Sequence, residues 1–422
     1  MTNPPLIDSV RPAWRAAGWP DDLLKTALRL SLPLRLLAGW VEQGRQGLER
    51  AQWLVPQADE LTFGTLRGRE ASAQDNDRFA DLWANADEQV GDWRITVCRE
   101  PNAFAQFRLQ ENVSIPVIEE QGKLLACVVW AKRNLIVSGE QLTVHCGQGL
   151  RVHRDCRGRG FGNLVREVAS AFWYPPTTGQ YHYIRSQNFG AVNFFKHTSP
   201  RVVSSSPERE GDVPGIPVTV LQLPARRVAG VAEGVRRALP SDVRRCVALI
   251  NRTHRGQDLY RPYTVESLKL RLDEGYWGPR SSWVEHVYGW QDYFVLEEAG
   301  EIVACSGLWD RGRDMREEWL NTVTGEQKAI DVTALLDFGF AAGHERAMAR
   351  LIAYFINETE HLGRDCLLAP LQQSSGVAAL LEEFRPVADT RGLGWFLWDE
   401  ESERLGRPFV DVKRPHIDLA YW

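Results

Sequence analysis

The stretch Leu150-Arg151-Val152-His153-Arg154-Asp155-Cys156-Arg157-Gly158-Arg159-Gly160-Phe161-Gly162-Asn163-Leu164 decides the fold. Residues 141–152 carry the pattern of an apolar strand that ends at Val152. Residues 163–172 place Leu164, Val165, Val168 and Ala169 on one face at helical spacing. Between them, glycines alternate with arginines. The segment therefore predicts a strand, a glycine-rich loop and the start of a helix.

This loop has the chemistry of an anion cradle. Glycines let successive backbone N–H groups converge, and a helix N-terminus adds unpaired donors and a positive dipole end. Arg157 and Arg159 add positive charge, so a pyrophosphate would fit. A dinucleotide fingerprint requires G-x-G-x-x-G in an early strand-helix-strand unit, and a Walker loop requires Gly-Lys-Ser/Thr. Here the glycines are spaced G-x-G-x-G after the third or fourth element, which disfavours both.

The segment from Val152 to Gly162 resembles motif A of the GNAT superfamily of N-acetyltransferases. A second segment, Asn188-Phe189-Gly190-Ala191-Val192-Asn193-Phe194-Phe195, is similar to the family's N-x-x-A-x-x-φ-Y pattern and lies one helix and one strand later. The resemblance covers residues 61–223. It implies an acyl-CoA co-substrate, acetyl-CoA or another short acyl-CoA, without a metal.

The resemblance also implies which residues bind the coenzyme. Backbone groups of two strand residues would hold the pantetheine arm, main-chain amides of the loop would hold the pyrophosphate, and two residues of the second segment would line the arm. These are Leu150 and Val152, then Arg157, Gly158, Arg159, Gly160, Phe161 and Gly162, then Asn188 and Phe195. The family normally has Tyr at position 195 to protonate the leaving thiolate. Phe195 cannot do so, which leaves Tyr181, Tyr183, a water, or unassisted departure of the thiolate.

The general base is open between several residues. Acylation of an amine needs a proton acceptor near the strand that precedes the loop. His145 is the only side chain on that strand that titrates near neutral pH, although it also fits an ordinary strand histidine. Glu119 and Glu120 end the preceding hairpin strand and are the next candidates. Cys146 is either an acyl-carrying nucleophile or a buried, inert thiol.

The second half repeats the order of elements. A hairpin over residues 115–132 is followed by the strand, cradle and helix, and a hairpin over 293–309 is followed by a strand at 330–338, a helix at 345–362 and a strand at 365–369. We predict an α/β fold of two tandem GNAT-like domains, each a mixed sheet flanked by helices. The predicted domains are 1–56 (a helical extension), 57–225 (the acyl-CoA domain) and 226–422. The last reads Gly339-Phe340-Ala341-Ala342-Gly343-His344-Glu345 at the loop, and Glu345 would repel phosphate, so we predict a degenerate copy there.

Bulk composition excludes several classes of protein. The 422 residues carry a net charge of −5, so nucleic acid is not a general partner. The seven cysteines are scattered and form no CxxC pair, which excludes a disulfide framework and a zinc spacing. The N-terminus lacks a secretory pattern and no long apolar run occurs. We therefore expect a cytoplasmic enzyme without a membrane partner, and a homodimer is compatible with the sequence.

Three functions remain open at this point. The first is an acyl-CoA-dependent N-acyltransferase that acts on a small-molecule amine. The second is an enzyme of the same fold with an unusual donor such as aminoacyl-tRNA, for which three arginine pairs between residues 226 and 245 are a weak indication. The third is a non-catalytic acyl-CoA sensor, which Phe195 favours.

Overall fold

The computed structural model describes residues 15–16, 60–63, 65–172, 179–185, 188, 190–191, 216–285, 287–371, 376–397, 412 and 414–422. The chain forms two compact units that are interleaved along the sequence. Unit 1 contains residues up to 78, 114–130 and 149–176, and unit 2 contains 79–113, 131–148 and 177–422. The predicted domain boundaries stay a prediction, and the predicted helical extension at 1–56 lies almost wholly outside the described residues.

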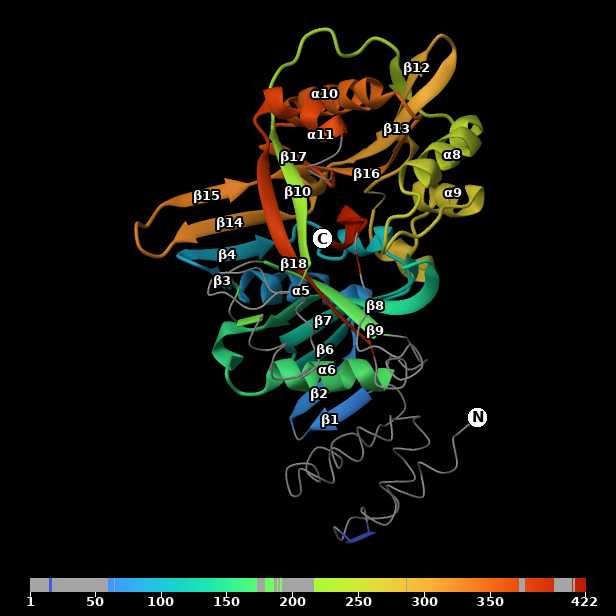
Figure 1. Cartoon of the computed structure of the whole chain (residues 1–422). Coiled ribbons are helices and arrows are strands. Elements are labelled where there is room, and N and C mark those ends of the chain that lie inside the picture. Colours follow the sequence, from blue (N-terminus) through green and yellow to red (C-terminus); the bar gives the residue numbers. More distant parts are fainter. Residues whose placement is uncertain are drawn as a thin grey trace. The chain divides into compact units, whose positions relative to one another are not determined.

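Unit 1 is a small antiparallel sheet covered by one helix. β1 (Glu60–Phe63) pairs with β2 (Leu66–Glu70), β2 with β6 (Pro116–Glu120), and β6 with the first part of β7 (Lys123–Val137). The β6–β7 turn has Gly122 at φ +80, as the predicted hairpin requires. Helix α6 (Phe161–Phe172) lies along β6 and β2 (Figure 1). Its predicted apolar face is confirmed, because Val165, Val168 and Ala169 are fully buried.

Unit 2 is built on a large mixed sheet. Its strands run in the order β9 (Gly179–Arg185), β18 (Val387–Leu397), β10 (Ile216–Pro224), β17 (Cys366–Ala369), β16 (Val332–Phe340), β13 (Glu301–Trp309), β12 (Tyr293–Glu298) and β11 (Val235–Arg237). β16 and β17 are parallel, and the chain between them forms helix α10 (Glu345–His361). β8 (Glu140–Val152) and β9 are also parallel, and α6 lies between them in the chain. The repeated strand-helix-strand order predicted from the sequence is therefore present.

Two helices cover opposite faces of β16. Phe338 belongs to the apolar core that α10 forms with the sheet, whereas the Cα of Gly339 faces helix α8 (Val243–Thr253), where an added Cβ would lie 2.3 Å from the backbone nitrogen of Ile250. Successive strand residues point to opposite faces, so α8 and α10 sandwich the strand. Figure 1 shows α10 along β12, β13, β16 and β17, with α8 followed by α9 (Val265–Asp273).

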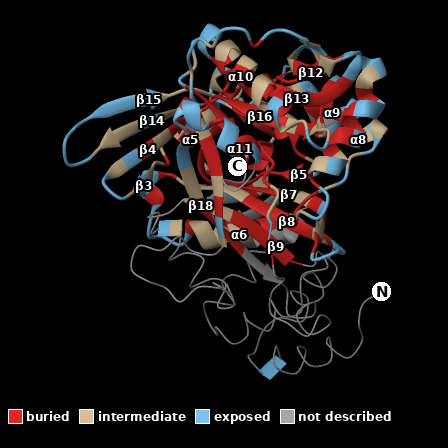
Figure 2. Cartoon of the chain, turned by 45° about the horizontal axis from the view of Figure 1, so that its top comes forward, coloured by how far each residue is buried: buried red, intermediate tan, exposed pale blue. Residues whose placement is uncertain are grey.

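A second sheet of unit 2 was not predicted. It has four strands in the order β15 (Gln327–Ile330), β14 (Arg316–Asn321), β4 (Trp93–Cys98) and β3 (Glu88–Val90). The β14–β15 hairpin is largely exposed (Figure 2), so its sequence is charged rather than alternating apolar. The single strand predicted at 330–338 is corrected here. The strand is interrupted at Asp331, whose N–H donates to the Asp365 carboxylate at 2.7 Å. β15 and β16 lie in different sheets.

Two short 3₁₀ turns adjoin helices of unit 2. Residues Pro240–Asp242 form one before helix α8, and the Asp242 carboxylate accepts the N–H of Leu239 there at 2.8 Å. The other follows helix α11 (Gly376–Leu380).

Candidate functional site

The predicted cradle is a loop held at both ends. His153, the first residue after β8, is buried, and its N–H donates to the Leu125 carbonyl of β7 at 2.8 Å. A 3₁₀ turn (Arg154–Cys156) follows, with Cys156 buried beneath it. The loop then becomes exposed until Phe161, which is buried at the start of α6. The exposed stretch is therefore anchored by buried neighbours rather than by its own packing.

Backbone conformation explains the two glycines of this exposed stretch. Gly158 has φ +72 and Gly160 has φ +84, values at which a side chain is strained. In the part of the chain that the structure describes, no atom beyond the two neighbouring residues lies within 4 Å of the position that a Cβ would take at either glycine. The glycines therefore set the course of the chain and keep the space over the loop open.

The loop ends at the N-terminus of α6. The Gly160 carbonyl accepts the first helical hydrogen bond, from the N–H of Leu164 at 3.0 Å. Helix geometry leaves the N–H groups of the first turn without intrahelical acceptors, and no acidic residue lies in that turn. The Arg157 and Arg159 side chains belong to this exposed stretch, with the guanidinium of Arg159 5.4 Å from the Phe161 ring. The N–H donors, the positive end of the helix dipole and the charges of the two arginines therefore all favour binding of an anion.

The parallel pairing of β8 with β9 ends before the loop. Its parallel pairing with β9 covers Val144, His145 and Cys146, and three residues later Gly149 has φ +58. Such a residue marks a bulge in a strand. Leu150 and Val152 follow and are only partly buried. They lie on the strand that leads directly into the loop.

Gly147 is a residue that the sequence analysis missed. An added Cβ there would lie 2.3 Å from Cε1 of His182, and the His182 Nδ1 is 3.0 Å from the Gly147 carbonyl oxygen. The imidazole of β9 thus takes the space of a side chain at the first position after the parallel pairing. Only a glycine at position 147 permits this approach, and nothing in the local sequence pattern indicates it.

The predicted catalytic residues lie in different surroundings. His145 is buried, and burial, with the charge of Lys132, lowers the pKa of its imidazole to about 4. The ring is therefore neutral at pH 7, but it is a weak base. Tyr183 is partly buried beside Trp422, with the ring centroids 5.1 Å apart, and desolvation raises the pKa of its hydroxyl. It therefore keeps its proton at neutral pH.

His145 and Tyr183 face opposite sides of the strand layer. Cys146 is opposite Tyr181 in the parallel register, and Tyr183 is two residues further along β9, so these three share one face. His145 precedes Cys146 and points to the other face. The structure does not bring these two candidates together.

Glu119 and Glu120 are occupied by unit 1 itself. The buried Glu119 carboxylate pairs with Arg69 at 2.5 Å, Arg78 at 3.2 Å and Arg67 at 3.4 Å. Glu120, the next residue, accepts the hydroxyl of Thr65. The three arginines around Glu119 indicate a structural role in the β2–β6 pair.

Asn188 forms a local turn. Its side-chain oxygen accepts the N–H of Ala191 at 3.1 Å, and its amide donates to Glu88 at 3.3 Å. The side chain thus bonds to the backbone of the second motif at Ala191. Phe195 lies outside the described residues, so its predicted place along the coenzyme A arm stays a prediction.

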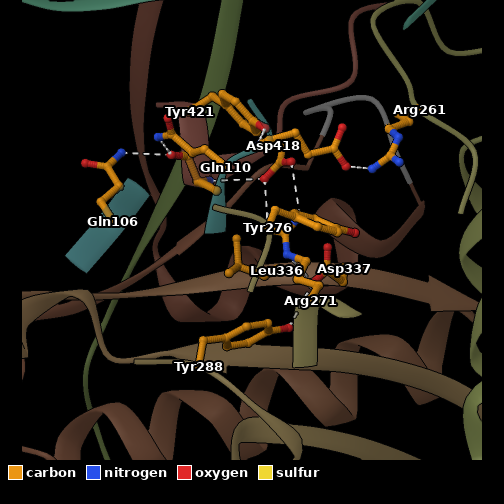
Figure 3. Close-up of polar contacts among 12 residues, drawn as sticks. Gln106, Gln110, Arg261, Arg271, Tyr276, Tyr288, Leu336, Asp337, Asp418 and Tyr421 are labelled. Atoms are coloured by element: carbon orange, nitrogen blue, oxygen red, sulfur yellow. Dashed lines mark hydrogen bonds and ion pairs between the residues drawn. The ribbon is translucent and has the colours of Figure 1, made fainter. Parts of the chain in front are cut away.

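A buried polar network was not predicted at all. Arg133 donates to the Tyr181 hydroxyl at 2.8 Å and pairs with Asp418 at 3.3 Å, and Asp418 pairs with Arg271 at 3.3 Å. Arg271 also pairs with Asp337 of β16 at 3.1 Å. Figure 3 shows Asp418 between its neighbours, with the amide of Gln106 directed toward the last turn of the chain. That amide donates to the Ala420 carbonyl at 2.8 Å.

This network balances two buried arginines with two buried aspartates. Burial alone would raise the pKa of Asp418, but Arg271 and Arg133 lower it to about 2. Burial raises the pKa of Asp337, and Arg271 opposes that shift. The network residues are far apart in the chain, at positions 133, 271, 337 and 418, so no local motif reveals them.

Comparison with known proteins identifies the fold. No family model and no curated protein matches the sequence. A structure of Saccharomyces cerevisiae N-myristoyltransferase with bound myristoyl-CoA is 13% identical, with a TM-score of 0.53 over 81% of this chain and 85% of that chain. A second, with myristoyl-CoA and inhibitors, is 12% identical, with a TM-score of 0.51 over 80% of this chain and 81% of that chain. A GCN5-related N-acetyltransferase from Sphaerobacter thermophilus is 15% identical, with a TM-score of 0.46 over 85% of this chain and 98% of that chain.

The chain has the GNAT fold. The resemblance found at the glycine loop is thereby confirmed at the level of the fold, and so is the mixed α/β class. In the described residues no helix is long and apolar enough to cross a membrane, and no three His, Cys, Asp or Glu side chains gather as metal ligands.

Proposed function

We propose that this protein is an acyl-CoA-dependent N-acyltransferase whose acceptor is the amine of a small molecule. One observation carries the proposal: the open, glycine-shaped loop between β8 and α6, with Gly158 and Gly160 at positive φ and two exposed arginines. A pyrophosphate would bind to the amides of residues 158–163. Leu150 and Val152 would offer strand-like hydrogen bonds to the pantetheine arm.

The reaction would join the acceptor nitrogen to the acyl carbon. The nitrogen lone pair attacks the thioester carbonyl, the C–S bond breaks, and the coenzyme leaves as a thiolate. The amine loses one proton and the thiolate gains one. The raised pKa of Tyr183 makes it a weak proton donor to the thiolate, and the pKa of about 4 makes His145 a weak proton acceptor for the amine.

The weak basicity of His145 supports a second function. The Glu119 carboxylate is already paired with arginines, so neither predicted base is well placed to act, which favours a protein that binds acyl-CoA without turning it over. An acceptor that is already a neutral amine at the working pH would remove this objection. The two functions therefore differ in turnover, not in coenzyme binding.

The test is release of free thiol from a panel of acyl-CoA donors, from acetyl to myristoyl, against a panel of small amines. If the protein is an N-acyltransferase, we expect release of free thiol that needs both a donor and an amine and that is abolished in Gly160→Asp. The matched control is Gly343→Asp, which adds the same charge at φ +78 before helix α10 and retains activity. Coenzyme binding without release from any donor and amine pair would establish the sensor instead.

A further inference from the structure

Unit 2 contains a cavity that the proposed reaction does not use. Its volume is about 190 Å³, and it lies among β9, β10, β16, β17 and β18 of the large sheet and β14 of the small one. Apolar side chains supply much of its wall, among them Met315, Trp319 and Leu368. A cavity of ~150 Å³ accommodates benzene. This one therefore has room for a small organic molecule.

Three arginines line the cavity, and two of them have carboxylate partners. Arg185 donates to Glu317 and lies 4.0 Å from Glu88. Arg391 pairs with Asp389 at 3.3 Å, and its guanidinium stacks on the ring of Trp422 at 4.0 Å. These contacts neutralise two of the three positive charges.

Arg311 is the third arginine and is differently placed. It is 6% exposed, and its contact in the described chain is a weak one, from Nη2 to the sulfur of Met315 at 3.8 Å. Among the described residues, no carboxylate lies within ion-pair distance of it, and its Nε has no acceptor. Burial lowers the pKa of Arg311 to about 10; the negative charge of Glu317 opposes this shift, and the positive charges of Arg391 and Arg185 add to it.

The acids that line the cavity are already engaged. Glu317 accepts from Arg185 through one oxygen and from Trp319 Nε1 at 3.1 Å through the other. Asp389 forms an ion pair with Arg391. A buried guanidinium without a counter-ion is costly, and a buried charge is normally paired. Among the described residues, Arg311 is therefore the arginine of this cavity that no carboxylate pairs with, and its Nε faces no acceptor.

We propose that this cavity binds a small monocarboxylate, with its carboxylate on Arg311 and its apolar body against Trp319 and Leu368. The planar guanidinium matches the two oxygens of a carboxylate. A phosphate dianion fits less well, because its second negative charge would face Glu317 and Asp389. The site is independent of coenzyme A, so it stands or falls apart from the acyl-transfer proposal.

The test is calorimetric titration of the full chain with sodium benzoate and, separately, with benzamide. The two probes share their shape and differ in charge. We expect benzoate to bind and benzamide not to bind. Equal binding of the two probes, binding of neither, or tighter binding of inorganic phosphate than of benzoate would overturn the assignment.

A pair of variants locates the site. Arg311→Met should weaken benzoate binding by about 10- to 100-fold, the range for a charge-assisted hydrogen bond. Arg316→Met removes a half-exposed arginine of β14 that is not among the residues lining the cavity. It should leave the affinity for benzoate unchanged. Without probe, Arg311→Met should melt at or above the temperature of the wild type, because it removes an unpaired buried charge. Unchanged benzoate affinity in Arg311→Met would place the anion elsewhere and contradict the proposal.

Discussion

Strands β8 and β16 follow one plan and end in opposite chemistry. Each pairs in parallel with the next strand of its repeat over three residues, the last being Cys146 in β8 and Ala334 in β16. Three residues after that pair, each strand has a residue at positive φ, Gly149 at +58 and Asp337 at +51. The shared geometry reaches to a single backbone angle, although the side chains differ.

The two strands differ in the side chain at this position. Gly149 of β8 has no side chain. At Asp337 a buried carboxylate accepts hydrogen bonds from the hydroxyls of Tyr263 and Tyr288 and pairs with Arg271. The second strand thus carries a bonded carboxylate at this position, whereas the first has no side chain there.

The loops that follow differ in the same sense. Gly160 at φ +84 precedes α6 and Gly343 at φ +78 precedes α10, so both helices begin after a left-handed glycine. The first turn of α10 contains Glu345, and His344 before it is bonded to Glu298 at 3.2 Å. One repeat therefore presents donors and positive charge, and the other has neutralised both.

The largest expected effect on stability comes from removing the Asp337 carboxylate of β16. Asp337→Ala removes one of the two carboxylates that pair with Arg271 and the acceptor of two tyrosine hydroxyls, and we expect the free energy of unfolding to fall by about 3–5 kcal/mol. Urea denaturation measures it. Asp310→Ala is the control, because that carboxylate pairs with Arg364 at 2.8 Å while 24% exposed, and should cost about 1 kcal/mol or less. Equal losses in the two variants would mean that the β16 network adds nothing to stability.

The next effect is on the pH dependence of stability and comes from His145 of β8. His145 lies one residue before the last parallel pair of its strand, as Thr333 does in β16. The folded-state pKa of about 4 lies below the unfolded value of about 6.5, so the unfolded chain binds more protons in that window. Stability should fall as the pH drops from 6.5 to 4, by about 3 kcal/mol from this group alone. His145→Thr should remove that part of the slope in denaturation curves taken at several pH values. A slope that persists unchanged would contradict the burial argument.

The smallest effect separates conformation from binding. Gly160→Ala and Gly122→Ala both place a side chain at φ near +80 in open space, so each should cost about 1 kcal/mol in stability. Thermal denaturation checks that the two losses agree. Only Gly160→Ala should also weaken coenzyme A binding. If Gly122→Ala weakened it as much, the β6–β7 turn would be part of the site.

Elements with strong local patterns could be predicted from the sequence. The β6–β7 and β12–β13 hairpins have a glycine turn between apolar strands, and α6 and α10 have clear apolar faces. β14 and β15 could not be predicted in this way, because exposed strands carry no alternation. At the site, the loop conformation agrees with its glycines. The Asp418 network, the approach of His182 to Gly147 and the unpaired Arg311 depend on residues brought together only by the fold.

The contrast between the two repeats predicts one coenzyme site per chain, and calorimetric titration with coenzyme A tests this directly. The account predicts a stoichiometry of one in the wild type, retention of binding in Gly343→Asp and its loss in Gly160→Asp. Two equivalents bound per chain, loss in Gly343→Asp, or no binding by the wild type would contradict it.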